Sequence, residues 1–261
     1  MEKYLSIVNI RTLVALSITA LVTFLTINFN FQYNFDLTMI SIAIIFPLVF
    51  TIRSAFKRRE KALEFLSRFK AGLITTDAAI QSNTKIPIED KNSIRETILE
   101  VSKNLKEYLG PEPVPIEKVR KEAQKITNFL QDYIQYFKFN PAMKIHGFMR
   151  DVYIGIENTA SIKEHSTPAS IRAYCLVFIY LYPVVYTPSL YYQMQGGFGE
   201  NDSWVLYFLT LFSVFILISL YNVQEQLENP YDQKGLDDIQ LENFDLDFGK
   251  IEAKEKENLA V

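Results

Sequence analysis

The sequence predicts an all-α membrane protein in which four transmembrane helices accompany a helical bundle outside the membrane. Three observations lead to this fold class. Four long stretches contain no Asp, Glu, Lys or Arg, at residues 12–35, 37–52, 173–199 and 203–224. The polar middle of the chain repeats its apolar residues with helical spacing and shows no strand-like alternation. Basic residues gather at one end of the apolar stretches, as they do beside membrane helices.

The composition of the whole chain conceals this clustering. Over 261 residues, 49% hydrophobic and 22% charged residues would also suit a soluble protein. The single cysteine, Cys175, lies inside an apolar stretch, which excludes a disulfide-stabilised scaffold. The balance of 27 Lys and Arg against 30 Asp and Glu gives a net charge of −3 and excludes a strongly basic nucleic-acid-binding protein.

The first two apolar stretches predict an N-terminal transmembrane hairpin over residues 1–53. Crossing a hydrocarbon core takes roughly 20 helical residues. We expect spans at about 10–28 and 37–53, joined by a short turn rich in Phe, Tyr and Asn. A signal peptide is the alternative for the first stretch, but no small-residue cleavage site follows it and a second apolar stretch comes almost at once.

The distribution of basic residues predicts the orientation. The second span is followed directly by Arg53, Lys57, Arg58, Arg59 and Lys61, whereas the loops inside both hairpins carry no Lys or Arg. The positive-inside rule therefore predicts a multi-pass protein of the plasma (inner) membrane with both termini and the long middle segment in the cytoplasm.

The middle segment, residues 54–170, is predicted to be a cytoplasmic helical region. Apolar residues recur at three- and four-residue steps after residue 53, so we expect the second span to continue far into the cytoplasm as one helix. Further amphipathic helices are expected at about 88–109, 115–139 and 141–164. Proline and glycine mark their boundaries, at Pro87, Gly110-Pro111 and Asn140-Pro141.

The C-terminal part combines a second hairpin with an acidic tail. Residues 171–223 predict spans at about 172–192 and 203–222. Residues 224–261 form the acidic cytoplasmic tail, with eleven acidic residues, four lysines and a net charge of −7. Such a tail either lies along the basic cytoplasmic surface or is solvated and disordered, and composition favours disorder beyond about residue 247.

Signatures of catalysis are scarce. His146 and His165 stand apart, without a paired cysteine or the spacing of a zinc site. The sequence contains no phosphate-binding glycine loop and no nucleophile elbow. We therefore expect no enzyme activity, no cofactor and no nucleic-acid partner.

The second apolar stretch carries the strongest functional pattern. Ser41, Ile45 and Val49 fall on one face of a helix that runs directly into the basic cluster. If several copies of this helix surround an axis, that face lines a narrow hydrophobic pore. Periodicity alone leaves the alternative open that the same face contacts lipid or the interior of the bundle.

Short motifs around the spans resemble those of the bestrophin family. After the last span the chain reads Asn229-Pro230-Tyr231, followed by the acidic and apolar stretch 235–242. The second span ends in Arg53-Ser54-Ala55-Phe56, similar to the arginine and aromatic residue that end the family's pore helix. A weaker similarity runs from Ser170-Ile171-Arg172 into Leu181-Tyr182-Pro183. The resemblance extends over the whole order of segments.

This resemblance implies a fold, a function and a site. Bestrophins are pentameric ion channels, mostly anion-selective, with some bacterial members that pass cations. Their second helix forms a hydrophobic neck. On this sequence the resemblance implies a neck of Ser41, Ile45 and Val49, or of Ile42, Phe46 and Phe50 if the helix is rotated. It implies an inner pore mouth at Arg53 and Lys57.

The sequence departs from the family pattern in two ways. The proposed neck carries Ile and Val where the family often has aromatic rings, and the tryptophans common after the arginine are absent. Animal members bind calcium at an acidic cluster after the Asn-Pro turn, where this chain has Asp232, Asp237 and Asp238. Residues 233–235 interrupt that cluster, so we expect no metal there.

Two hypotheses of different classes follow. The first is a bestrophin-like homopentameric ion channel that prefers chloride, with the lipid bilayer and permeant inorganic ions as its other partners. The second is a non-conducting membrane scaffold whose cytoplasmic helices bind a protein partner. The scaffold needs no pore and predicts monomers or dimers, so the number of subunits distinguishes the two.

Overall fold

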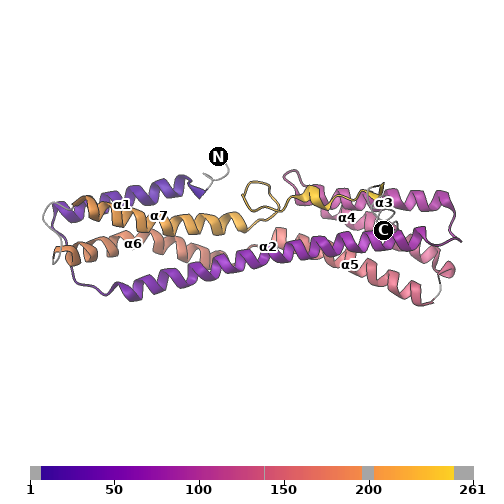
Figure 1. The fold of residues 1–261 in the computed structure, drawn as a ribbon, viewed down its shortest axis with the longest axis horizontal. Helices are drawn as coiled ribbons and strands as arrows, with labels where there is room; N and C mark the ends of the chain where they lie inside the picture. The colour runs from indigo at the N-terminus through magenta and orange to yellow at the C-terminus, as the bar shows by residue number, and fades with distance from the viewer. Residues whose placement is uncertain (1–6, 138, 196–202, 250–261) are drawn as a thin grey trace, which may run out of the picture. The chain divides into compact units, whose positions relative to one another are not determined.

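The computed structural model describes residues 7–137, 139–195 and 203–249. In chain order its elements are α1 (Ile10–Asn28), α2 (Leu37–Gln81), α3 (Ile88–Leu109), α4 (Ile116–Asp132), the 3-10 turn η2 (Ile134–Tyr136), α5 (Phe139–Glu164), α6 (Ala169–Gln195), α7 (Ser203–Leu227) and the 3-10 turn η3 (Leu241–Phe244) (Figure 1). The described ranges contain no β-strand. The predicted all-α fold is confirmed.

Within the described ranges, four segments are long and apolar enough to cross a membrane. They are Ile10–Asn28, Leu37–Gln81, Pro141–Met194 and Ser203–Leu227. The third includes both α5 and α6, and the part of it without charged residues begins at Ala173, inside α6. The chain is therefore a multi-pass membrane protein, as the apolar stretches predicted.

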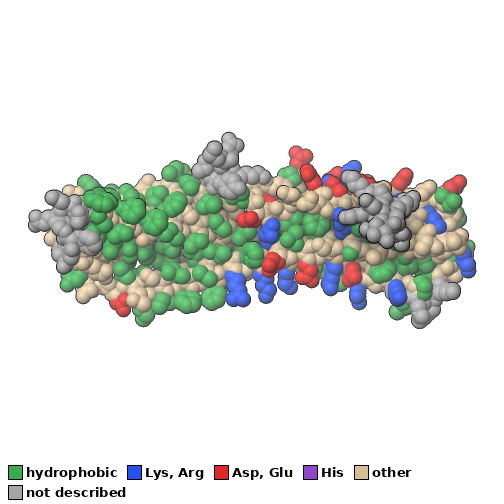
Figure 2. Space-filling view, in the orientation of Figure 1, with side chains coloured by type: hydrophobic (Ala, Val, Ile, Leu, Met, Phe, Trp, Pro, Cys, Tyr) green, Lys and Arg blue, Asp and Glu red, His purple; other side chains and the backbone are tan. Residues whose placement is uncertain are grey.

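The chain divides into two compact units. The first, here called the membrane unit, comprises Met1–Arg59, Ser166–Asn229 and Lys234–Asp237. The second, here called the polar unit, comprises Glu60–His165, Pro230–Gln233 and Asp238–Val261. Green hydrophobic side chains cover most of the visible surface of the membrane unit, whereas Lys, Arg, Asp and Glu gather on the polar unit (Figure 2).

Small and polar residues hold the membrane unit together. The buried side of α1 consists of Thr12, Ala15, Thr19, Thr23 and Thr26. Small side chains let the helices approach closely, which drives helix packing where lipid is as apolar as the protein. The hydroxyls of Thr23 and Thr210 lie 3.2 Å apart and form a hydrogen bond between α1 and α7. The amide of Asn222 donates to Thr12 Oγ1 at 2.9 Å.

The polar unit is built around an apolar core of helix faces. Ile98, Val119, Ile126 and Ile156 are fully buried in it, from α3, α4 and α5. Two glycines bring α2 and α5 together, because a Cβ at Gly155 would lie 2.5 Å from Phe69 Cβ. A Cβ at Gly72 would likewise lie 2.8 Å from the Phe148 carbonyl oxygen. Larger residues at either position would force the two helices apart.

One ion pair of the polar unit has a buried member. The side chain of Asp77 on α2 is 4% exposed and accepts two hydrogen bonds from Arg95 on α3. The distances are 3.1 Å from Nε to Oδ1 and 2.8 Å from Nη2 to Oδ2. This two-point geometry suits the planar guanidinium and fixes α3 against α2.

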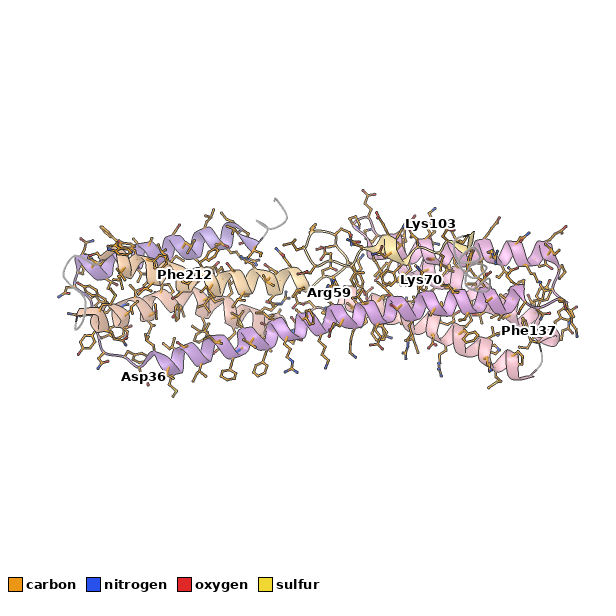
Figure 3. All side chains as sticks on the ribbon, viewed as in Figure 1. Asp36, Arg59, Lys70, Lys103, Phe137 and Phe212 are labelled. Carbon is orange, nitrogen blue, oxygen red and sulfur yellow. The ribbon has the colours of Figure 1, made fainter. Side chains whose placement is uncertain are left out.

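Residues 238–249 of the acidic tail pack within the polar unit, whereas residues 224–229 and 234–237 belong to the membrane unit. Ile239, Leu241 and Phe248 are buried in the same core as the helices. Lys106 pairs with Asp245 at 2.6 Å, and Lys70 donates to the Asn243 carbonyl oxygen at 3.0 Å. Figure 3 shows Lys70 on α2 and Lys103 on α3, the two helices on which the tail lies. Residues 238–249 therefore lie on a basic part of the polar unit, and residues 250–261 fall outside the described residues.

The helix predicted for residues 115–139 is shorter in the structure. It ends at Asp132 and is followed by η2. Tyr133 packs on Phe129 with ring centroids 4.6 Å apart and donates a hydrogen bond to Asp90 of α3. These contacts of Tyr133 with two helices accompany the change from α-helix to a 3-10 turn.

Candidate functional site

The part of α2 in the membrane unit has one buried side and one exposed side. Ile44 and Leu48 are each 1% exposed and share a core with Cys175 and Ile179 of α6. On the other side, Phe46 is 56% exposed. A helix in a membrane that exposes large apolar side chains faces lipid, another protein copy or a hydrophobic lumen.

The residues predicted for the neck lie on this exposed side. Ile42, Ile45, Phe46, Val49 and Phe50 are exposed, and Ser41 is half-buried. Both predicted rows thus occupy one face, and a single copy of the chain does not distinguish between them. A groove of about 470 Å³ runs over the start of this face and is lined by Leu37, Thr38, Ser41, Ile42, Ile45 and Phe46.

Pro47 lies inside α2 without ending the helix. Because proline has no backbone N–H, the carbonyl of Ala43, four residues earlier, loses its helical donor. The hydroxyl of Tyr174 on α6 donates to that carbonyl at 3.4 Å. The presence of a proline in a span indicates that some neighbour must supply a donor. The sequence does not reveal that Tyr174 is that neighbour.

The basic residues after the span divide into two groups. Arg58 donates through Nε to the Glu228 carbonyl oxygen at 3.1 Å, and Arg59 donates to the carbonyl oxygen of Asp237. These two arginines therefore hold the chain that follows α7. Arg53 and Lys57 are exposed and make no ion pair within the described residues. Lys61 is likewise exposed and makes no ion pair there, so the predicted pore-mouth residues are two of three basic residues after the span whose charges are accessible.

A buried carboxylate anchors the same end of the membrane unit. Glu228 is 7% exposed and accepts hydrogen bonds from the backbone N–H and hydroxyl of Thr167. Gln224 donates to it through Nε2 at 2.7 Å. No role for Glu228, Thr167 or Gln224 is predicted from the sequence. Their contacts join the ends of α6 and α7, which no local pattern encodes.

The three aspartates considered for calcium are not gathered into a metal site. Asp232 and Asp238 belong to the polar unit, and Asp237 belongs to the membrane unit. Among the described residues, no group of three or more His, Cys, Asp or Glu side chains is arranged to hold a metal ion. The oxygen ligands that calcium requires in number do not converge there.

Solved structures of a bacterial bestrophin homolog have a fold similar to that of this chain. This chain resembles a crystal structure of a bacterial bestrophin homolog from Klebsiella pneumoniae with a TM-score of 0.71 and 13% sequence identity. The match covers 90% of this chain and 93% of the other. Two single-residue variants of that homolog give TM-scores of 0.71 and 0.69, at 12% and 13% identity. They cover 90% of this chain and 94% and 93% of theirs.

No family model matches the sequence, and no curated protein matches it. At 12–13% identity the similarity concerns the fold, and it extends over nearly the whole of both chains. The chain therefore has the bestrophin fold, as its motifs and the order of its segments predicted.

Proposed function

We propose that five copies of this chain form an ion channel in the plasma membrane, with their α2 helices around a central axis and chloride as the preferred ion. The observation that carries this proposal is the exposed face of α2, where a row of apolar side chains leads to Arg53 and Lys57. The bestrophin fold supports it, because the resemblance of the sequence motifs to that family implies a pore along the same helix.

The neck of the channel is the row Ser41, Ile45 and Val49. The four-residue spacing places these side chains one above another on the helix. In a pentamer these three positions give three rings of five side chains each, which narrow the path and control it by excluding water until the helices move apart. A small rotation of α2 would instead bring Ile42, Phe46 and Phe50 to the axis, since both rows are accessible on the same face.

The preference for anions follows from charge. Each subunit contributes Arg53 and Lys57, which are exposed and make no ion pair in the described chain. A ring of fixed positive charge raises the local concentration of anions and lowers that of cations. The positive-inside rule assigns this ring, both termini and the polar unit to the cytoplasmic side. The channel carries out no catalysis in this proposal.

Recording in a planar bilayer tests the proposal. We expect the purified protein to conduct under a potassium chloride gradient. Its reversal potential should lie closer to the equilibrium potential of chloride than to that of potassium. Cross-linking in native membranes should give a ladder of bands that ends at five subunits. A conducting pentamer with a reversal potential that follows only potassium would contradict the anion preference alone.

The scaffold hypothesis predicts the opposite pair of results. In that case the cross-linking ladder ends at two subunits and no current rises above the lipid background. These two results together would support the membrane scaffold and contradict the channel. The matched control is the same protein heated past its unfolding temperature before reconstitution. The current that it gives measures the leak caused by unfolded protein in the bilayer.

A further inference from the structure

The polar unit contains an open pocket at the end of α2 that plays no part in the proposed channel function. Its volume is about 530 Å³, within the range of about 300–1,000 Å³ that small-molecule sites occupy. The pocket lies between the end of α2, the segment around η2 and the first turns of α5, and all of its lining residues belong to the polar unit. The labelled Phe137 marks this end of the unit in Figure 3.

Aromatic and aliphatic side chains form most of the pocket wall. Tyr136 and Phe137 contribute rings from the segment after α4, and Phe148 contributes a third ring from α5. Pro141 and Ile145 line the pocket from the same side of α5, since the steps from 141 to 145 and from 145 to 148 follow the helical repeat. Ring faces of this kind pack well against a flat aromatic body.

The wall carries a single charge, and that charge is positive. Among the residues that line the pocket, Lys144 is the charged one, and none is Asp or Glu. Lys144 is exposed and makes no ion pair within the described ranges. One ammonium group balances one carboxylate, whereas phosphate sites in proteins gather several donors. The pocket therefore suits a ligand with a single negative charge.

The hydrogen-bond acceptors at the end of α2 are already occupied. The last four carbonyls of a helix lack helical donors, and they favour a cation. Here the carbonyls of residues 78–80 accept hydrogen bonds from Ser82 and Asn83 at 3.0–3.1 Å. The carbonyl of Gln81 accepts one from the ammonium group of Lys91 at 2.9 Å. The end of α2 thus has no need of a cationic ligand, and the accessible charge of Lys144 favours an anionic one.

We propose that this pocket binds a small aromatic carboxylic acid, with its ring against Tyr136, Phe137 and Phe148 and its carboxylate at Lys144. The inference goes beyond the proposed channel function and does not depend on it, because it requires neither a pore nor an oligomer. A neutral ring compound would lose the contact with Lys144, and an aromatic amine would place a second cation beside it.

Isothermal titration calorimetry on the full-length protein in lipid nanodiscs tests the proposal. The two probes are indole-3-acetate and its uncharged amide, indole-3-acetamide, and empty nanodiscs provide the blank. We expect the parent protein to bind the acid at least about fivefold more tightly than the amide, because a charge-assisted hydrogen bond is stronger than a neutral one.

Lys144→Gln separates the contribution of charge from that of the apolar wall. This variant should bind the acid at least about fivefold more weakly than the parent does and should bind the amide unchanged. Its matched control is Lys121→Gln, which should change neither affinity. Lys121 is also exposed and makes no ion pair within the described ranges, but it lies on α4 outside the pocket.

Two variants of Ser82 test whether the probes occupy the pocket itself. Ser82 is an exposed residue of the pocket wall, so Ser82→Trp fills the space with a large ring and should abolish the binding of both probes. Ser82→Ala leaves the space open and should bind both as the parent does. If Ser82→Trp aggregates on a sizing column, Tyr136→Ala replaces it and should weaken both probes by about threefold or more, because one ring of the wall is lost.

Three results would overturn the proposal. Equal affinities of the parent for the acid and the amide would exclude the carboxylate contact. Acid binding that survives both Lys144→Gln and the loss of pocket space would place the ligand elsewhere. Absence of binding of either probe to the parent would exclude the site. Because none of these measurements records a current, each result leaves the test of the channel function separate.

Discussion

The carboxylate of Glu228, directly after α7, accepts a hydrogen bond of 3.0 Å from the backbone N–H of Thr167, two residues before α6 begins. The start of a helix favours negative charge, because its first N–H groups have no helical acceptor. The backbone carbonyl of the same Glu228 accepts a hydrogen bond from Arg58 of α2. One residue therefore ties together α2, α6 and α7 within the membrane unit.

Removing this carboxylate should destabilise the membrane unit. Glu228→Ala leaves the backbone N–H of Thr167 and the amide of Gln224 without their buried acceptor. Each unsatisfied buried donor costs about 1–3 kcal/mol. We expect a clearly lower midpoint of thermal unfolding in detergent, followed by the loss of the folded monomer or oligomer on a sizing column.

Glu228→Gln is the matched control for charge. The oxygen Oε1 of Gln224 is buried and has no hydrogen-bond partner among the described residues. If the Gln224 amide flips, this oxygen can accept from a glutamine at 228. We therefore expect Glu228→Gln to lose less than half of the stability that Glu228→Ala loses. Equal losses would show that the negative charge, and not the hydrogen bonds, is what the anchor requires.

Asn104 on α3 is predicted to limit the stability of the polar unit. Its side chain is fully buried, and neither its amide nitrogen nor its oxygen has a hydrogen-bond partner among the described residues. Replacing an unsatisfied polar group by an apolar one of similar size removes a penalty of about 1–3 kcal/mol. Asn104→Leu should therefore raise the unfolding temperature. A lower unfolding temperature for Asn104→Leu than for Asn104→Ala would contradict this explanation.

The acidic tail should be held by its apolar side chains more than by its charges. Burying a phenylalanine such as Phe248 contributes about 1.5–3 kcal/mol. The pair Lys106–Asp245 has side chains that are 35% and 51% exposed, and pairs of this kind contribute about 0–1 kcal/mol. We expect Phe248→Ala to release the tail to limited proteolysis, whereas Lys106→Gln and 1 M salt change its cleavage little. Salt-dependent release of the parent tail would reverse this ranking.

The sequence predicts those helices of this protein whose ends are marked locally. The predicted range 88–109 agrees with α3 because Pro87 and Gly110 punctuate it. The sequence also predicts that the second span continues as one helix well beyond residue 53, since apolar residues keep their helical spacing among the lysines and arginines, and α2 runs to Gln81. Local signals of this kind need no knowledge of distant contacts.

The parts that the sequence does not predict depend on distant contacts. Arg58 and Glu228 are 170 residues apart in the chain, so no pattern distinguishes Arg58 from the accessible Lys57 next to it. The docking of the tail was one of two alternatives, because charge composition indicates solvation as readily as attraction. Its apolar residues Ile239, Leu241 and Phe248 decide the matter by entering the core.

Single cysteines along α2 should identify the row that faces the pore. The native Cys175 is fully buried, so the parent chain should stay unlabelled by a water-soluble, thiol-specific reagent and serves as the control. The reagent attacks the thiolate, which forms in water and not in lipid. We expect labelling and loss of current for Ser41→Cys, Ile45→Cys and Val49→Cys, and protection for Ile42→Cys, Phe46→Cys and Phe50→Cys.

Side-chain size gives an independent check on the same row. Truncation of a residue in a hydrophobic constriction widens it and makes it easier to wet, so Ile45→Ala and Val49→Ala should leak in the closed state. Phe46→Ala serves as the comparison, since it removes more volume from a side chain outside the proposed row. If the cysteines at Ile42, Phe46 and Phe50 are labelled and Phe46→Ala is the variant that leaks, α2 is rotated about its axis relative to the proposed row. If no position in either row is labelled, the exposed face of α2 contacts lipid or protein and lines no pore.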